Sequence, residues 1–356
     1  MTKELNINRL RNALNESKYE SLVIRSLDNI EWASGFSGSN AWLFIDNTEN
    51  YLATDSRYAT QAEEESKNWH ISIGERHGVS NISEIINESP AHNIAILEND
   101  ISLKEYNQLA KELKPNKTIH VLEEGDDLLI RLRMTKTKDE INKIEQSAQL
   151  ASDVIEFGVR QIHTGMTEKE LVHQIESYAK KQGAQKMSFD TIVASGARAA
   201  MPHAKPQNET IMDNSMVLID LGVYLDGYAS DITRTQWIGQ SNEKFERIYS
   251  LVKLAQEMAS ERCEAGMSGR DVHAIADTVF NEANISDLFI HGLGHGVGKA
   301  IHESPYLDKD SDDILKPGSI ITIEPGIYIP GWGGIRIEDM FEVTDTKLRQ
   351  ITTADK

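Results

Sequence analysis

The sequence predicts a mixed α/β (α+β) protein with an N-terminal α/β domain and a larger C-terminal domain of helices, strands and glycine turns. Three observations predict this class. A chain of 356 residues is long enough to bury two separate cores. Short apolar runs alternate with helical segments over residues 1–125, and helical periodicity follows a polar stretch. We therefore expect an N-terminal domain over 1–125, a linker over 126–138 and a C-terminal domain over 139–356.

Short apolar segments predict five or six strands in the N-terminal domain. The segments are YESLVIRS (19–26), AWLFID (41–46), YLAT (51–54), HISIGE (70–75), NIAILEN (93–99) and TIHVLEE (118–124). Helical stretches are expected before the first strand and between the others. In one of them Ser102 and Glu105 have the spacing of a capping box, in which each side chain binds the backbone N–H of the other residue.

Helical spacing also marks the C-terminal domain. A first helix is predicted by apolar residues three and four positions apart, namely Ile141, Ile144, Ala148, Ala151 and Ile155. Thr167 and Glu170 form a second expected capping box, and Gly183 marks the end of that helix. Residues 243–265 and 269–283 are two more expected helices, and strands with glycine turns separate these helices from residue 190 onward.

Composition and charge argue against several functions. A net charge of −19 makes nucleic acid and anionic membranes poor partners, because both are bound through clustered Lys and Arg. Apolar runs such as MVLI (216–219) are far shorter than the roughly 20 residues of a membrane span, and the N-terminus lacks the apolar segment of a signal peptide. The single cysteine, Cys263, cannot form an internal disulfide. We expect a cytoplasmic protein with no nucleic-acid or membrane partner.

A weak internal repeat lies in the C-terminal domain. IMDNSMVLIDLG (211–222) aligns with LKPGSIITIEPG (315–326), and each comprises a turn, a strand and an acid followed two positions later by glycine. A glycine turn and a second strand follow each segment, GYASDITRT (227–235) and GGIRIEDMF (333–341). Two hairpins can match by coincidence. The alternative is two related halves that bring four carboxylates together.

These four carboxylates are unusual because they occupy apolar strand segments. A carboxylate in a sheet is costly unless it is paired or binds a metal, although any one of them could be a structural acid that caps a turn. The histidine-rich segment HGLGHGVGKAIHESP (291–305) adds imidazole groups. Carboxylates with one imidazole suit two first-row divalent ions better than a structural zinc. The candidate acids are Asp220, Asp231, Glu324 and Glu338.

Four segments of the C-terminal domain resemble the signatures of the pita-bread metallopeptidases, in the proline-directed branch of aminopeptidase P and prolidase. They are MPHAKP (201–206), DLGVYLDGYASDITRT (220–235), HGLGHGVGKAIHESP (291–305) and EPGIYIPGWGGIRIED (324–339). The resemblance extends over residues 135–345. NIEWASGFSGSNAWLFIDN (29–47) and YLATDSRYATQAEEE (51–65) are similar to the non-catalytic N-terminal domain of that branch.

The resemblance implies a pita-bread catalytic domain of two related halves and a set of site residues. Asp231 and Glu338 would bridge two divalent ions, His295 and Glu324 would complete one ion, and Asp220 would chelate the other. Glu324 would also carry a proton during hydrolysis. Further catalytic positions near the substrate fall on His203, His291 and His302. Arg336, in a match to the family pattern GxRxED, would hold the acids together through charge-assisted hydrogen bonds.

The resemblance also implies the reaction, in which a hydroxide that bridges the two ions hydrolyses an Xaa-Pro bond in a proline-containing peptide. Mn²⁺ is the expected metal, with Co²⁺ or Zn²⁺ as alternatives, and a homodimer is expected. In prolidases an arginine often follows the HExP segment, but Tyr306 stands there in this chain. The sequence therefore favours an aminopeptidase P-like enzyme over a prolidase, unless another cation, such as Arg57 or one from a second subunit, binds the substrate carboxylate.

Three less favoured alternatives share the fold. A creatinase-like hydrolase would work without metal and would lack the ligand set, and a non-enzymatic binding protein on the same fold would have lost ligands. A methionine aminopeptidase would lack an N-terminal domain of this size. Metal-dependent peptidase activity would eliminate the first two, and specificity for proline at the second position of a peptide would eliminate the third.

Overall fold

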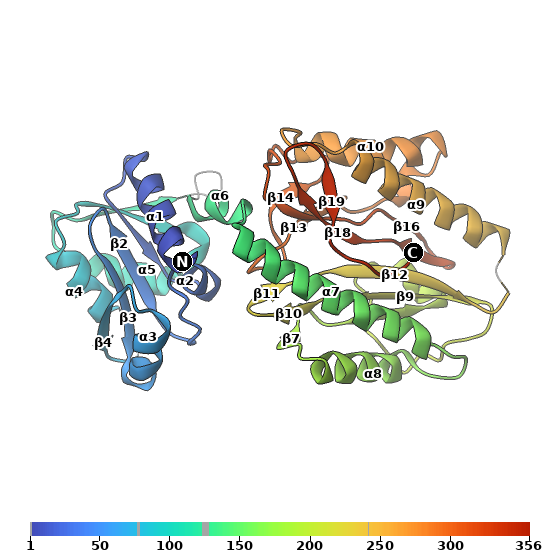
Figure 1. Cartoon of the computed structure of the whole chain (residues 1–356), viewed down its shortest axis with the longest axis horizontal. Coiled ribbons are helices and arrows are strands. Elements are labelled where there is room, and N and C mark those ends of the chain that lie inside the picture. The colour runs from blue at the N-terminus through green and yellow to red at the C-terminus, as the bar shows by residue number, and fades with distance from the viewer. Residues whose placement is uncertain (1, 77–78, 123–127, 241) are drawn as a thin grey trace. The chain divides into compact units, whose positions relative to one another are not determined.

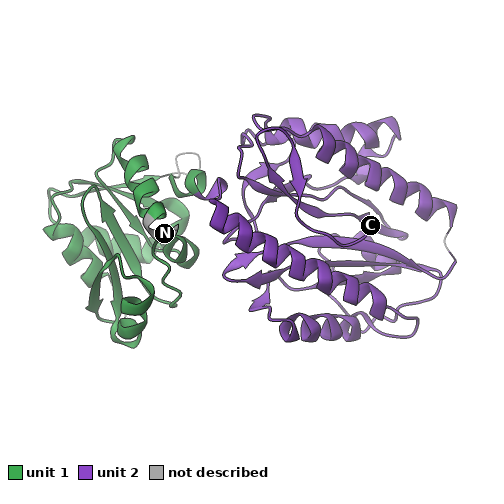
Figure 2. Cartoon of the chain, in the orientation of Figure 1, with its two compact units in different colours: residues 1–132 green, residues 133–356 purple. Residues whose placement is uncertain are grey.

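The computed structural model describes residues 2–76, 79–122, 128–240 and 242–356. The chain divides into two compact units, Met1–Leu132 and Arg133–Lys356 (Figure 2). Part of the stretch expected as a linker is helical, because α6 spans Leu128–Met134 and buries Leu128 and Leu129 in the core of the N-terminal unit. Residues 126–127 of that stretch lie outside the described residues.

A six-stranded mixed sheet forms the centre of the N-terminal unit, in the order β4-β3-β2-β1-β5-β6. The strands are β1 Ser21–Ile24, β2 Trp42–Asp46, β3 Asn50–Asp55, β4 His70–Gly74, β5 Asn93–Leu97 and β6 Thr118–Leu122. Each of the six apolar segments thus forms a strand, and the prediction for this unit is confirmed. β1–β2 and β2–β3 are antiparallel pairs, whereas the three other pairs are parallel.

Helices pack on both faces of this sheet, which explains why its central strands are apolar on both sides. They are α1 Thr2–Asn15, α2 Leu27–Ser34, α3 Ala59–Glu65, α4 Ser80–Glu88 and α5 Leu103–Glu112, with short 3₁₀ turns η1 Ser56–Tyr58 and η2 Glu98–Asp100. Leu22 packs with α1 and α2, whereas its neighbour Val23 packs with α4 and α5. The capping box of Ser102 and Glu105 is present.

The C-terminal unit begins with a half built from two helices and short strands. The helices are α7 Lys138–Gln161 and α8 Glu168–Lys181. β8 Ile192–Ser195, β9 Ser215–Leu221 and β12 Ile232–Ile238 form one sheet, and β7 Lys186–Met187, β10 Val223–Leu225 and β11 Tyr228–Ala229 form another. Apolar residues of α7 and α8 pack on β9 and β12 in a common core. Thr167 and Glu170 form the expected capping box.

The second half repeats this plan with different strands. Its helices are α9 Glu243–Arg262 and α10 Gly269–Glu282, and its short 3₁₀ turn is η5 Ser286–Leu288. The five-stranded sheet comprises β14 Glu303–Leu307, β13 Gly294–Gly296, β15 Ile320–Ile323, β18 Asp339–Val343 and β19 Leu348–Gln350. β16 Gly326–Ile329 and β17 Gly333–Arg336 form a hairpin. Helix α9 packs on β15 and on this hairpin.

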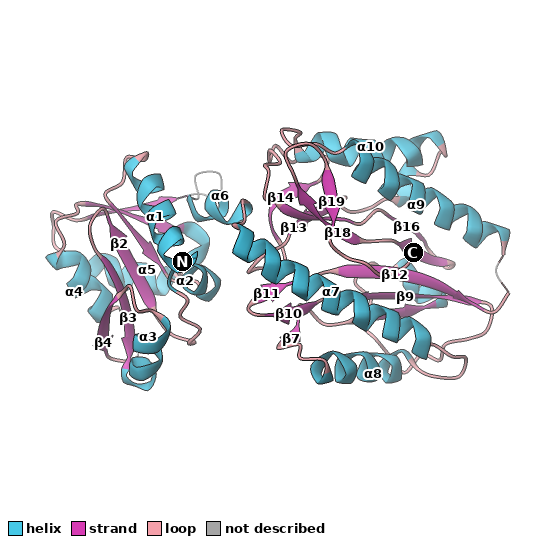
Figure 3. Cartoon of the chain, viewed as in Figure 1, coloured by secondary structure: helices cyan, strands magenta, loops and turns pink. Residues whose placement is uncertain are grey.

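The two segments of the internal repeat occupy equivalent places in the two halves. β9 pairs with β12 in the first half, and β15 pairs with β18 in the second, both antiparallel. The strands lie between the helix pair α9–α10 and the helices α7 and α8 (Figures 1 and 3). Fold class and domain types therefore agree with the pita-bread expectation. In the described part of the chain, no helix combines the length and apolarity that a membrane span requires.

Candidate metal centre

The four carboxylates lie at the ends of the paired strands of both halves. Asp220 is near the end of β9 and Asp231 directly precedes β12. Glu324 directly follows β15 and Glu338 directly precedes β18. The backbone N–H of Glu338 donates to the carbonyl oxygen of Thr233 at 3.2 Å, so the two halves meet at this point. The apolar strands are buried, and each therefore delivers its acid into the interior of the unit.

All five predicted ligands come together in three overlapping groups. Within each group the potential ligand atoms lie within 4.8 Å of one another. The groups are Asp231, His295 and His302; His295, Glu324 and Glu338; and Asp220, Asp231 and Glu338. Two groups that share residues are the arrangement that two neighbouring ions need. His302, expected near the substrate and not on an ion, also belongs to one group.

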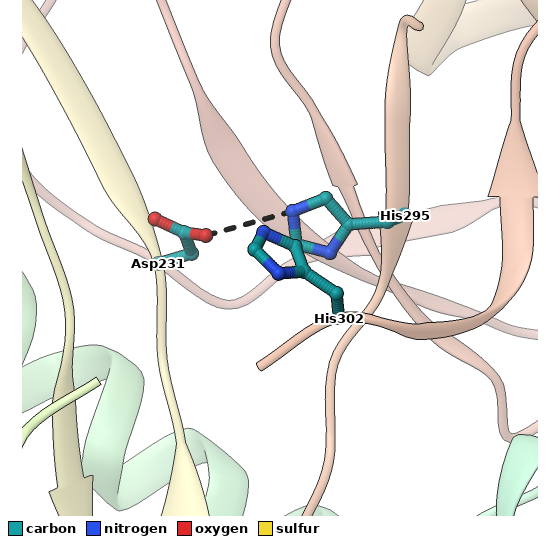
Figure 4. Close-up of side chains that lie close together, drawn as sticks. All are labelled: Asp231, His295 and His302. Atoms are coloured by element: carbon teal, nitrogen blue, oxygen red, sulfur yellow. Dashed lines mark ion pairs between the residues drawn. The ribbon is translucent and has the colours of Figure 1, made fainter. Parts of the chain in front are cut away.

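His295 presents one ring nitrogen to the carboxylates. Its Nδ1 lies 3.0 Å from the carbonyl oxygen of Gly296, which can only accept, so Nδ1 carries the proton. Nε2 therefore offers a lone pair, and it lies 3.6 Å from Asp231 Oδ2 (Figure 4). It also lies 3.3 Å from Glu324 Oε1. Burial lowers the pKa of His295 to about 4, which keeps the ring neutral. A neutral imidazole fixed through Nδ1 is the form that binds a divalent ion.

The carboxylates have unused oxygen atoms that fit metal ions. Asp220 Oδ1, Asp231 Oδ1 and Glu338 Oε1 are buried without a hydrogen-bond partner among the described residues. Burial, followed by repulsion from neighbouring carboxylates, raises the pKa of Asp231 and Glu338 well above the usual range. Burial also raises the pKa of Glu324 to about 7. A cluster of orphaned oxygens whose negative charge is destabilised fits divalent cations, which would supply the missing partners.

Arg336 links the metal centre to its support. Its Nη2 donates to Asp220 Oδ2 at 2.5 Å, its Nε donates to Thr233 Oγ1 at 3.1 Å, and its Nη1 donates to the hydroxyl of Tyr328 at 2.7 Å. The guanidinium group is buried. Arg336 therefore holds an acid of the first half from a strand of the second half, as expected for the arginine of GxRxED.

His291 is bound on both ring nitrogens. Nδ1 lies 2.7 Å from the carbonyl oxygen of Gly292 and therefore donates, whereas Nε2 lies 2.9 Å from the hydroxyl of Tyr328. Burial, followed by the charge of Arg336, lowers the pKa of His291 to about 4, so the ring is neutral and Nε2 accepts from Tyr328. In this arrangement His291 lies near the substrate cavity, as expected, but has no N–H left to donate to a substrate carbonyl. A supporting role fits better.

A cavity of about 780 Å³ gives access to the metal centre. The predicted ligands and Arg336 contribute to its lining, as do all three histidines expected near the substrate, His203, His291 and His302. His203 and His302 are exposed to it, and the ring of His302 lies edge-on to His295 with centroids 4.4 Å apart. Tyr306 also lines the cavity. Cavities of this volume accommodate small ligands such as short peptides.

Arg57, the cation named as a possible carboxylate anchor, lies in the N-terminal unit. Its Nε and Nη2 donate to both carboxylate oxygens of Asp55, at 2.7 and 2.9 Å. The N-terminal unit thus uses this charge in an internal ion pair with Asp55, whose carboxylate also caps η1 by accepting from the backbone N–H of Arg57.

Besides Arg336, which the sequence predicted, other residues that the sequence did not reveal support the site. Tyr328 is one of them; in the folded hairpin it lies in strand β16 opposite Gly334, where a side chain would collide with the tyrosine ring and with the carbonyl oxygen of Ala199. Thr322 is another, because its hydroxyl donates to Glu324 Oε1 at 3.1 Å and accepts from the backbone N–H of His295 at 3.0 Å.

The residue after His302 is held by two cations. Glu303 accepts from Arg133 at 2.5 Å and forms an ion pair with Lys136 at 2.8 Å. Although burial acts in the opposite direction, these cations hold the pKa of Glu303 below its usual value. The carboxylate also occupies the space where a side chain at Gly298 would lie. The histidine segment is therefore fixed next to His302 by an ion pair that its sequence alone does not reveal.

Fold and site together define a two-domain metallopeptidase with a pita-bread catalytic domain. Comparison with known proteins gives the family: residues 142–345 match the model of metallopeptidase family M24, and residues 6–135 match the Creatinase/Prolidase N-terminal domain. The chain belongs to metallopeptidase family M24. Members of this family use divalent metal ions, and the chain is a metallo-exopeptidase of the proline-directed branch.

Similar proteins cover nearly the whole chain. The Xaa-Pro dipeptidase of Pyrococcus furiosus is 34% identical over 344 residues, which are 96% of each chain. The structure of an Xaa-Pro dipeptidase from Bacillus anthracis matches with a TM-score of 0.95 at 32% identity, covering 99% of this chain and 98% of that one. An X-Pro aminopeptidase from Thermotoga maritima matches with a TM-score of 0.88 at 30% identity, covering 97% and 98%. The resemblance found in the sequence is confirmed, while dipeptidases and an aminopeptidase both occur among the relatives.

Proposed function

We propose that the protein is an Xaa-Pro dipeptidase, a metal-dependent enzyme that hydrolyses the bond between a first residue and a C-terminal proline. The observation that carries this proposal is the near full-length similarity to Xaa-Pro dipeptidases from Pyrococcus furiosus and Bacillus anthracis. It replaces the preference for an aminopeptidase P-like enzyme that Tyr306 favoured. An aminopeptidase acting on longer Xaa-Pro peptides is the second candidate, supported by the Thermotoga maritima relative.

The ligand set of the proposal is Asp220, Asp231, His295, Glu324 and Glu338, which lie in overlapping groups around buried oxygens that lack partners. Two divalent ions held there supply positive charge that polarises a carbonyl group and lowers the pKa of water. Mn²⁺ is the metal we propose, because carboxylate oxygens dominate the ligand set.

The side chains of the site have distinct tasks in hydrolysis. His302 is exposed to the cavity next to His295 and donates a hydrogen bond to the oxygen of the scissile carbonyl as negative charge develops there. Glu324 Oε1 is bound by Thr322, so Oε2 is the atom that takes a proton from water and returns it to the departing proline nitrogen.

Proline suits this cavity because a peptide bond to proline has no N–H. A site for such a bond needs no acceptor at that position. The free α-amino group of the substrate lies near the acids in the proposal, which limits cleavage to the first bond of the peptide. His291 and Arg336 do not touch the substrate here; they orient Tyr328 and Asp220.

A comparison of two substrates tests the proposal. Protein stripped with EDTA and reloaded with Mn²⁺ is incubated with an Xaa-Pro dipeptide and with the Xaa-Pro-Yaa tripeptide that shares its first residue. We expect cleavage of the dipeptide, none without metal, and a much lower kcat/KM for the tripeptide. Equal or faster cleavage of the tripeptide would make the enzyme an aminopeptidase.

The proposal includes a homodimer in the cytoplasm. The lone cysteine, Cys263, is buried, and burial raises the pKa of its thiol to about 12, so it is inert as a thiol in a reducing compartment. Sedimentation velocity of the Mn²⁺-loaded protein measures the oligomeric state.

A further inference from the structure

Two exposed lysines line the same cavity as the metal centre. The cations in the lining are Lys169, Lys205 and Arg336. Arg336 is engaged by Asp220 and Tyr328. Lys169 and Lys205 are exposed, and neither ammonium group has a hydrogen bond or ion pair within the described parts of the chain. Both are therefore available to an anionic ligand in the same cavity as the metal centre.

The two lysines lie on adjacent stretches of backbone. The N–H of Lys169, in the first turn of α8, donates to the carbonyl oxygen of Gln207 at 3.2 Å. The preceding N–H, of Glu168, donates to the carbonyl oxygen of Glu209 at 3.0 Å. The start of α8 thus runs beside the segment that follows Lys205, and both lysines belong to one wall of the cavity.

A buried ion pair fixes this wall. Glu168 is fully buried and accepts from the backbone N–H groups of Ser195 and Gln207 at 2.8 and 2.9 Å, and from Arg198 Nε at 3.1 Å. Arg198 Nη2 in turn donates to the carbonyl oxygen of Lys205 at 2.7 Å. The guanidinium group of Arg198 is therefore engaged by Glu168 and by the backbone of Lys205. Arg198 holds this backbone in place and is not available to a ligand.

A dipeptide places special demands on such a cavity. At neutral pH an Xaa-Pro dipeptide carries a cation at one end and a carboxylate close to the scissile bond, whereas a longer peptide has a neutral amide in place of that carboxylate. The cavity is lined by the acids of the metal centre and also by Glu176, Asp190 and Asp308, so an unpaired carboxylate would be repelled. Tyr306 carries no positive charge at neutral pH.

We propose that Lys205, with Lys169 beside it, binds the free carboxylate of the substrate's proline and thereby selects dipeptides. The inference rests on the proposed dipeptidase function and assigns its specificity to a wall of the cavity that is separate from the HExP segment. A lysine can bind a carboxylate as a point charge without the fixed geometry of an arginine.

Paired substrates and variants test this assignment. The kcat/KM of the Mn²⁺-loaded enzyme is measured for an Xaa-Pro dipeptide and for the same dipeptide with a C-terminal amide, which differ in one charge. The variants are Lys205→Gln, Lys169→Gln, the double variant and Lys205→Arg, with Lys180→Gln as the control. Lys180 is an exposed lysine in the last turn of the same helix, α8, and does not line the cavity.

We expect the wild type to prefer the dipeptide over its amide and Lys205→Gln to reduce this preference about tenfold, the scale of one charge-assisted hydrogen bond. The reduced preference should appear as a higher KM for the dipeptide. Lys169→Gln should reduce the preference further, and Lys205→Arg should retain most of it. If the wild type prefers the dipeptide and the double variant shows the same preference, the lysine assignment is wrong but the dipeptidase function stands. A wild type that favours the amide would overturn the dipeptidase function as well.

Discussion

The hydroxyl group of Tyr328 donates a hydrogen bond to Nε2 of His291 across 2.9 Å. The same oxygen accepts from Arg336, whose guanidinium group also holds Asp220. A chain of hydrogen bonds therefore runs from a predicted metal ligand through an arginine and a tyrosine to a histidine on the cavity wall. Asp220, Arg336 and Tyr328 are buried, so the loss of one of these side chains leaves an unpaired polar atom at the site.

Removal of the tyrosine hydroxyl should weaken catalysis without removing metal. In Tyr328→Phe, His291 Nε2 and Arg336 Nη1 both lose a partner, and we expect kcat to fall about tenfold, as for one buried hydrogen bond. Metal content measured by atomic absorption should stay at the wild-type value. Tyr224→Phe is the matched control, because its hydroxyl donates to the carbonyl oxygen of Lys299. Equal kcat values for Tyr328→Phe and the wild type would show that the hydrogen bonds of the tyrosine hydroxyl have no part in turnover.

The bridging role proposed for two acids can be tested by truncation. Asp231→Ala and Glu338→Ala should each abolish turnover and metal binding, because each acid belongs to two of the three ligand groups. Bound metal is measured after dialysis against Mn²⁺, with circular dichroism to verify folding. Asp190→Ala, which removes an acid of the same cavity that lies outside those groups, should keep both properties. Full activity in either site variant would refute the two-metal assignment.

His302 separates two interpretations of the histidine segment. If it donates to the substrate, His302→Ala should retain its metal and lose on the order of 10²-fold in kcat, the scale of one oxyanion donor. If it binds an ion, as its place beside Asp231 and His295 allows, metal content should fall in parallel with activity. Titration of the metal-free variant with Mn²⁺ distinguishes the two, and a weakened affinity would make His302 a ligand.

The carboxylates should make the stability of the metal-free protein depend on pH. Burial raises the pKa of Glu324 to about 7 in the folded protein, from its usual value of about 4.3 in an unfolded chain. Between these values the folded state binds more protons than the unfolded state, so this group stabilises the fold at low pH, and that contribution is lost as the pH rises through 7. His291 and His295, whose pKa values are lowered by burial, act in the opposite direction below pH 6.5.

A comparison with Glu324→Gln isolates this effect, since the histidines are common to both proteins. Urea denaturation midpoints are measured at pH 5 and pH 8 in EDTA. From pH 5 to pH 8 the wild type should lose stability relative to the variant. A constant difference between the two proteins would mean that Glu324 titrates normally.

The ion pair behind the histidine segment should contribute strongly to stability. Glu303→Gln would leave Lys136, whose side chain is 2% exposed, without its counter-charge. We expect the free energy of unfolding to fall by about 3–5 kcal/mol, as when one partner of a buried ion pair is removed. Glu342→Gln, which breaks a pair with the half-exposed Arg349, should change it by less than about 1 kcal/mol. Similar effects of both variants would place Glu303 among ordinary surface acids.

The sequence predicted the parts of this molecule that depend on local chemistry. Apolar strands and capping boxes are local patterns, and an acid such as Asp220 in an apolar strand signals a metal because that placement is costly. Contacts between distant segments were not predictable in the same way. Tyr328 and His291 are 37 positions apart, and Arg133 and Glu303 are 170 positions apart. Only the folded chain reveals that these pairs meet.

The same limit applies to the preference over substrate length, for which the relatives support the dipeptidase alternative better than the aminopeptidase prediction. Tyr306 was judged against one position of a motif, as though the cation for a carboxylate had to stand there. Lys205 lies about a hundred positions earlier in the chain and reaches the same cavity through the fold. His291 was likewise assigned a catalytic position from its motif, although its hydrogen bonds depend on Tyr328, which lies outside that motif.

The carboxylates of the metal centre come from strand ends of both halves of the catalytic unit, so bound metal should affect the stability of the enzyme as well as its activity. Ions bound there would add cross-links between two half-sheets that are also joined by hydrogen bonds, such as the one between Glu338 and Thr233, and by the ion pair of Arg336 with Asp220. A ligand at 100 times its dissociation constant adds about 2.7 kcal/mol to the folded state. Loss of the metal would therefore remove this contribution to stability and shorten the lifetime of the enzyme among proteases, in addition to slowing its turnover.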